Sequence, residues 1–185
     1  MVPVMSLLLP IIVAAVIVFV ASSIIHMVTP FHKGDMKKVP NEDGVMSALR
    51  NFNLAPGDYA MPLPSSMAAM GTPEFKAKMA AGPVVMMTVR PSGKDGMMGA
   101  LAMWFAYSIV ISLFAAYVTG VALGPGADYL KVFQIAGCVA FTGYAMGLPQ
   151  ASIWGGKNWG TTMRGMADGL LYGLLTGGTF GWLWP

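Results

Sequence analysis

Charged residues are scarce in this 185-residue chain. They make up 10% of it, against roughly a quarter in ordinary soluble domains, while 56% of its residues are hydrophobic. This composition is that of a membrane protein. The net charge of +3 is too small to indicate a nucleic-acid partner. We therefore expect the lipid bilayer to be its first partner.

Cysteine and histidine are also rare. The single cysteine, Cys138, excludes a disulfide framework and a multi-cysteine metal site within the chain. His26 and His32 are the only histidines, and haem ligation in a bundle usually needs histidines that face each other from different helices. We interpret His26 as an interfacial side chain bonded to a backbone carbonyl or water. The alternative is a haem- or quinone-binding redox protein that uses His26.

Four stretches are apolar enough to suggest membrane spans. The first is about 22 residues long, which at 1.5 Å per residue crosses a hydrocarbon core of about 30 Å. No basic residue precedes it and no cleavage site follows it, so we expect a retained anchor and not a signal peptide. The sequence therefore predicts an all-α four-helix membrane bundle, with helices over residues 7–28, 97–123, 129–148 and 160–184.

The only long polar segment, residues 31–96, predicts a small mixed α/β insertion between the first two spans. Asn41 precedes the apolar residues of an amphipathic helix, and Thr72 followed by Pro73 opens a second helix. Residues 84–89 are β-branched and bounded by prolines, which indicates a strand, with residues 59–61 as its partner. We expect a unit of about 65 residues to lean on the membrane or on neighbouring helices.

The last span carries a glycine at every fourth residue. Residues four apart lie nearly above one another on a helix, so these glycines form a groove where another backbone can come close. A similar row of small residues on the second span is the first candidate partner of this groove. The predicted helix-packing residues are Gly165, Gly169, Gly173, Gly177 and Gly181 on the last span, and Ser112, Ala116 and Gly120, with Ser108, on the second.

The positive residues predict the orientation. The polar insertion and the loop before the last span hold most of them, namely Lys33, Lys37, Lys38, Arg90, Lys94, Lys157 and Arg164. The positive-inside rule then places residues 31–96 in the cytoplasm and both termini outside.

One charge pair is predicted inside the membrane. Arg164 and Asp168 are one helical turn apart at the start of the last span, and an i,i+4 pair of this kind neutralises itself while Arg164 reaches the headgroups. The alternative is a functional carboxylate, because embedded acids commonly serve ion or proton pathways. In that case the protein is a small ion or proton transporter or channel that uses Asp168 and Arg164.

The chain resembles a family of small four-span bacterial inner-membrane proteins with no known activity. The likeness rests on four stretches and covers nearly the full length: residues 30–32 (PFH), 39–42 (VPNE), 152–154 (SIW) and 179–185 (TFGWLWP). The resemblance implies a bacterial inner membrane and carries over no site residues.

The leading functional prediction is a non-enzymatic accessory subunit. Five glycines offer more close-approach surface than one neighbour within a four-helix bundle would use, which favours packing against a larger respiratory or photosynthetic complex or against a second copy. The sequence contains no catalytic set and no nucleotide fingerprint. We accordingly expect no enzymatic activity, no cofactor and no metal site.

Overall fold

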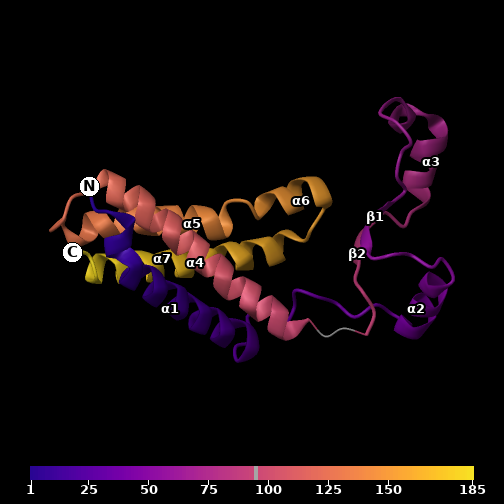
Figure 1. The fold of residues 1–185 in the computed structure, drawn as a ribbon. Helices are drawn as coiled ribbons and strands as arrows, with labels where there is room; N and C mark the ends of the chain where they lie inside the picture. The colour runs from indigo at the N-terminus through magenta and orange to yellow at the C-terminus, as the bar shows by residue number, and fades with distance from the viewer. Residues whose placement is uncertain (94–95) are drawn as a thin grey trace. The chain divides into compact units, whose positions relative to one another are not determined.

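The computed structural model describes residues 1–93 and 96–185, which form two compact units (Figure 1). The first unit combines Met1–Lys37 with Gly96–Pro185, and the second is Lys38–Asp95. The segment 31–37, predicted to belong to the polar insertion, is thus part of the helical unit. Lys94, which the orientation argument counts, lies outside the described residues.

Four long helices lie side by side in the first unit (Figure 1). Around the bundle, α1 is adjacent to α4, α4 to α5, α5 to α7, and α7 to α1. Helices α4 and α7 therefore face each other across the interior. The elements of this unit are the 3₁₀ turn η1 (Val4–Leu7), α1 (Leu8–Met27), α4 (Met97–Ala122), α5 (Tyr129–Ala145), α6 (Pro149–Gly155) and α7 (Trp159–Trp182).

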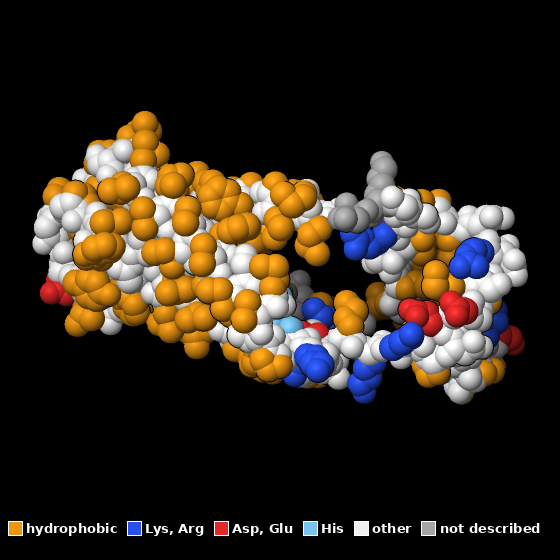
Figure 2. Space-filling view, turned by 90° about the horizontal axis from the view of Figure 1, so that it is seen from below, with side chains coloured by type: hydrophobic (Ala, Val, Ile, Leu, Met, Phe, Trp, Pro, Cys, Tyr) orange, Lys and Arg blue, Asp and Glu red, His pale blue; other side chains and the backbone are white. Residues whose placement is uncertain are grey.

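Three of the described segments are long and apolar enough to cross a membrane, namely Val4–Met27, Met97–Ala122 and Tyr129–Gly155. Hydrophobic side chains cover the face of the helical unit that Figure 2 shows, and charged groups gather beside a histidine at one end. The chain is therefore compatible with a multi-pass membrane protein. Helix α7 has a similar length, but it carries Arg164, Asp168 and the row of glycines.

The glycine row of α7 packs against α5. A β-carbon added at Gly169 would lie 2.7 Å from the Ala145 side chain, and one added at Gly177 would lie 2.6 Å from the carbonyl oxygen of Phe133. Gly165 faces Leu148, Gly173 faces Gly137 and Phe141, and Gly181 faces the ring of Tyr129. The partners run backward along α5 as the glycines run forward along α7, so the two helices are antiparallel.

The partner of the glycine row is thus α5, and not the small-residue row of α4 as the sequence suggested. On α4, Ala116 is buried in a cluster with Leu7 and Ile11, and Gly120 accepts a hydrogen bond of 2.8 Å from the backbone of Val2. Ser112 is buried as well. Because α5 and Leu148, which lies just beyond its end, meet all five glycines of α7, the row no longer implies a second protein.

A short helix, α6, replaces the interfacial loop predicted before the last span. Helix α5 ends at Ala145, before the predicted end of the third span at residue 148. Proline fits the first turn of a helix because its φ is preset and its missing N–H has no partner there. Pro149 therefore opens α6, and the hydroxyls of Ser152 and Thr162, 2.6 Å apart, join α6 to α7.

The second unit contains the predicted two-stranded sheet. Strands β1 (Gly57–Met61) and β2 (Val85–Val89) pair antiparallel, with Tyr59 opposite Met87. The Thr72 hydroxyl caps helix α3 by accepting a 3.2 Å hydrogen bond from Phe75, as predicted. The unit also holds α2 (Glu42–Arg50), η2 (Ala68–Gly71) and α3 (Pro73–Ala81).

No described residue of the second unit is buried. Its side chains include large apolar groups that stay exposed, such as Phe52 at 71% and Leu63 at 74%. Asn41 also departs from its expected role, because it takes a left-handed conformation at the start of α2 and its side chain makes no capping hydrogen bond. This unit consequently has no core of its own among the described residues.

Gly177→Ala should destabilise the helical unit by about 1–3 kcal/mol, the usual cost of overpacking, because the new methyl group would meet the Phe133 carbonyl. Gly178→Ala is the matched control, since its β-carbon would find only the Tyr129 hydroxyl, at an ordinary 3.7 Å. Thermal unfolding in detergent measures both. Equal melting temperatures for the two variants would contradict this account of the α5–α7 contact.

Candidate functional site

The site begins at the last turn of α1, where His26 lies. Its Nδ1 is 3.0 Å from the backbone carbonyl oxygen of Ser22, one turn earlier. A carbonyl can only accept, so Nδ1 carries the proton and Nε2 is left as the free ring nitrogen in the neutral form. The side chain of His26 is 51% exposed, so this nitrogen can reach the aqueous boundary.

The segment after α1 turns back and stacks the second histidine on the first. Pro30 follows the helix, and successive turns are closed by hydrogen bonds from Lys33 to Pro30 and from Asp35 to His32, each 3.0 Å long. The rings of His26 and His32 then lie 4.3 Å apart and nearly parallel, at 9°. These turns explain why 31–37 belongs with the helices.

Asp168 of α7 completes the group. It immediately precedes Gly169, whose contact with α5 sets the rotation of α7, and its side chain is only 8% exposed. Its Oδ2 lies 2.8 Å from Nε2 of His32 and 3.9 Å from Nε2 of His26. One ligand atom from each of the three residues lies within 4.8 Å of the others, close enough to share a metal ion. We call these three residues the His–His–Asp site.

A second carboxylate orients His32 from the other side. Nδ1 of His32 donates to Oδ2 of Asp35 at 2.7 Å, and the guanidinium of Arg164 donates to Oδ1 of Asp35, its Nε at 2.6 Å. The hydrogen bond from His32, with that from Arg164, lowers the pKa of Asp35 below its usual value although partial burial opposes this. Asp35 therefore stays ionised and keeps the Nδ1–H of His32 pointed toward it.

The charge partners differ from those predicted. Arg164 pairs with Asp35, which is distant in sequence, and Asp168 lies against the two histidines; within the described residues no Arg164–Asp168 contact shorter than 4 Å forms. The i,i+4 spacing allows the predicted pair. Arg164 instead pairs with Asp35, which the turn after Pro30 brings within its reach.

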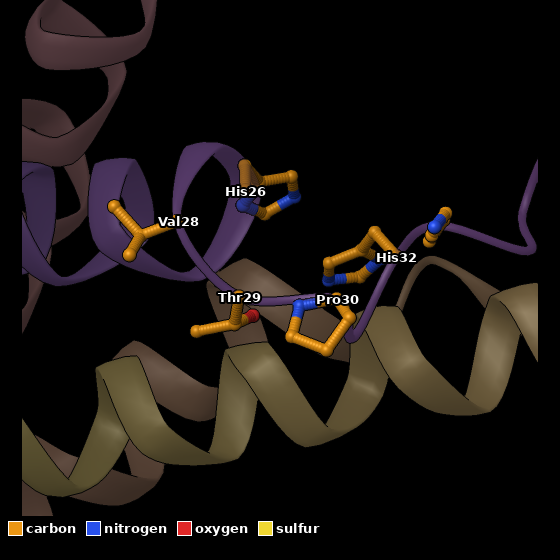
Figure 3. A pocket seen from close by; sticks show the side chains of 6 residues that line it. His26, Val28, Thr29, Pro30 and His32 are labelled. Carbon is orange, nitrogen blue, oxygen red and sulfur yellow. The ribbon is translucent and has the colours of Figure 1, made fainter.

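Beside the site is a hollow of about 370 Å³, open to the surroundings and lined by His26, His32 and the turn between them. Figure 3 shows the two imidazole rings next to each other, with Thr29 and Pro30 in the connecting segment beside the ribbon of α7. A small ligand or water molecules can thus reach the exposed edge of His26.

Sequence reasoning found two members of this site separately and missed the others. His26 and Asp168 were singled out, whereas His32 and Asp35 were assigned to the insertion. A metal site was not expected because no pair of ligands has helical spacing. The available signal was the short interval between the two histidines, interrupted by Pro30, together with the embedded Asp168, for which a functional role was the alternative interpretation.

No protein-family model, no curated protein and no solved structure matches this chain. The residues of the site are therefore interpreted from their own chemistry.

The Asp35–Arg164 ion pair should contribute measurably to stability, because both side chains are partly shielded from solvent and the hydrogen bonds between them are charge-assisted. A double-mutant cycle with Asp35→Asn and Arg164→Gln, read by thermal unfolding, tests this. The control cycle is the exposed pair Lys38–Glu42, for which we expect a coupling energy near zero. A coupling energy at Asp35–Arg164 no larger than that of the control pair would refute the assignment.

Proposed function

We propose that this protein is an integral membrane protein that binds one divalent transition-metal ion at the His–His–Asp site. The observation that carries the proposal is the hydrogen bonding of the two imidazoles. Both Nδ1 atoms are engaged, one by the Ser22 carbonyl and one by Asp35, and both Nε2 atoms lie beside the buried carboxylate of Asp168.

This pattern is what metal-binding histidines require. A ligating imidazole commonly donates its other N–H to a carbonyl or a carboxylate, which sets the tautomer and turns the lone pair toward the ion. Nε2 of His32 is buried and lies 2.8 Å from Oδ2 of Asp168. An unprotonated nitrogen beside a carboxylate oxygen is repulsive, and a cation between them removes that repulsion.

The spacing allows an ion after a small rearrangement. Ligand atoms around a tetrahedral Zn²⁺ are about 3.3 Å apart, since the metal–ligand distances are about 2.0–2.1 Å. The three atoms here are within 4.8 Å of one another. The parallel stacking of the rings keeps their lone pairs side by side, so His26 has to turn about its side-chain bonds to share an ion with His32. It is half exposed and free to do so.

The ligand set favours zinc or a similar borderline ion. Two imidazoles and one carboxylate suit Zn²⁺ and Fe²⁺ far better than Ca²⁺ or Mg²⁺, which prefer oxygen ligands alone. Three protein ligands leave a fourth position open, as in sites that bind water or a substrate. Here that position would be at the hollow lined by His26 and His32.

The membrane arrangement belongs to the same proposal. Helix α7, with 24 residues and a length of about 36 Å, serves as the fourth span, and its glycine row keeps it against α5. The basic residues place the insertion and the His–His–Asp site on the cytoplasmic side of a bacterial inner membrane, with both termini periplasmic. An accessory role beside a larger complex stays a prediction, but the glycine row no longer supports it.

Zinc titration tests the metal site. We expect purified protein, carrying an affinity tag without histidine, to bind one Zn²⁺ by isothermal titration calorimetry, and Co²⁺ to give the visible absorption of a low-symmetry site. Removing a ligand or its orienting carboxylate typically costs ten- to a hundredfold in affinity. His32→Ala, Asp168→Asn and Asp35→Asn should therefore each weaken binding by at least about tenfold.

Two matched variants serve as controls for these losses. Asp43→Asn removes an exposed carboxylate of the second unit, and Cys138→Ser removes the only thiol, which is also exposed. Both should bind zinc as the wild type does. Unchanged affinity in His32→Ala, or an equal loss in Cys138→Ser, would show that zinc binds elsewhere and would reject the His–His–Asp site.

The orientation is tested by reporter fusions at the C-terminus. Alkaline phosphatase should be active there and green fluorescent protein dark, because only the phosphatase matures in the periplasm. The reverse pattern would place the C-terminus in the cytoplasm and would rule out either the fourth span or the proposed orientation.

A further inference from the structure

A second hollow lies next to the one at the His–His–Asp site. It has a volume of about 290 Å³ and follows the last turns of α1, and we call it the α1 groove. Its lining is apolar apart from Ser23, whose hydroxyl donates to the carbonyl oxygen of Phe19 at 2.8 Å and has no hydrogen left for a ligand. The lining residues are Phe19, Val20, Ser23, Ile24, Met27 and Val28.

The two hollows meet at Val28, which lines both of them. Figure 3 shows Val28 on the side of α1 and His32 on the other side of the first hollow. The first hollow is polar, since His26, His32 and Lys33 line it, whereas the α1 groove is apolar. This division suits an amphiphile that has its headgroup at the end of α1 and a hydrocarbon chain along the helix.

The α1 groove lies on a part of the span that is open to lipid. Val20 and Ile24 in its lining are each 50% exposed. Over residues 19–28 the chain rises about 14 Å, close to the roughly 15 Å that one leaflet contributes to a hydrocarbon core of about 30 Å. A lipid chain in the groove would therefore cross one leaflet and leave its headgroup beside the His–His–Asp site.

One wall of the groove is fixed before a ligand arrives. The ring of Phe19 packs edge-on against that of Phe105 on α4, with centroids 5.5 Å apart and an angle of 81° between the planes. A preformed site loses less conformational freedom when it binds, which favours a specific lipid over the changing lipids of the bilayer.

The polar hollow has the charge to hold an anion. Lys33 is exposed and makes no ion pair within the described residues. With the imidazoles neutral as metal ligands, Arg164 and Lys33 match the carboxylates of Asp35 and Asp168. A bound divalent ion then leaves two positive charges for an incoming anion. A phosphate monoester carries a charge of about −1.5 to −2 at pH 7 and has oxygens that a metal ion can bind.

We propose that the His–His–Asp site, with its metal ion, binds a membrane lipid that ends in a phosphate monoester. One phosphate oxygen takes the open position on the ion, Lys33 pairs with another oxygen, and a hydrocarbon chain fills the α1 groove. The inference rests on the proposed metal site and names the ligand of its open position. A lipid is favoured over free phosphate because only a lipid uses both hollows.

Native mass spectrometry of the full chain in mild detergent tests this ligand. Zinc-loaded protein is titrated with dioleoyl phosphatidic acid and, separately, with dioleoyl phosphatidylcholine, which has the same chains but a phosphodiester headgroup. We expect one phosphatidic acid to bind at least about tenfold more tightly than phosphatidylcholine, and a chelator to abolish this preference. Equal binding of the two lipids, or a preference that the chelator leaves unchanged, would overturn the proposal.

Two substitutions test the two ends of the lipid site. Lys33→Gln removes the cation and Val20→Trp fills the α1 groove, so each should weaken phosphatidic acid binding by at least about fivefold. Lys37→Gln and Val121→Trp are the matched controls. Lys37 is also exposed but does not line the hollow, and Val121 is a 52% exposed valine of α4. Equal losses in the controls and the test variants would contradict the assignment.

Two further measurements separate the possible outcomes. Inorganic phosphate at the concentration of the lipid should not displace phosphatidic acid; displacement would assign the hollow to the free ion and overturn the lipid. Zinc binding without a lipid preference rejects the lipid alone. A failure to bind zinc rejects the metal site together with the ligand that depends on it.

Discussion

Backbone contact between α5 and α7 is the constraint on which the rest of the helical unit depends. A β-carbon added at Gly177 would lie 2.6 Å from the carbonyl oxygen of Phe133. Helix α7 can therefore neither rotate nor move outward without losing this contact. In lipid, such close approach replaces the hydrophobic effect as the source of helix association. The side chains that precede Gly169, Gly173 and Gly177 are thereby directed inward, and Asp168, Tyr172 and Thr176 are all buried.

The site follows from this constraint and from a turn in the chain. Asp168 of α7 lies next to the last turn of α1. The segment after Pro30 stacks His32 on His26 and brings Asp35 to Arg164. The group joins two carboxylates, one guanidinium and two imidazoles. Three of these residues come from a stretch of ten in sequence, and the other two from one turn of α7, so few elements have to be placed correctly for the group to form.

The sequence was sufficient for the elements and not for their partners. Glycine spacing indicated a close-packed helix, and the proline-bounded run indicated β2, because both signals are local. The sequence did not indicate that α5, rather than α4, packs against the glycine row of α7. Small residues on another span were available as partners, and the choice depends on the side-chain volumes along both candidate helices. The predicted Arg164–Asp168 ion pair was wrong for the same reason. The spacing in sequence allows it, but the fold brings Asp35 to Arg164 instead. Helix α6 was not predicted, although Pro149 fits the first turn of a helix.

The absence of buried side chains among the described residues of the second unit has a consequence for how this segment behaves on its own. Without an interior to exclude water, its two strands are held by little beyond their ladder of hydrogen bonds, and a two-stranded hairpin is marginal by itself. Cut away from the helices, the segment would open and close rapidly and would exchange its amide protons almost as fast as an unfolded peptide.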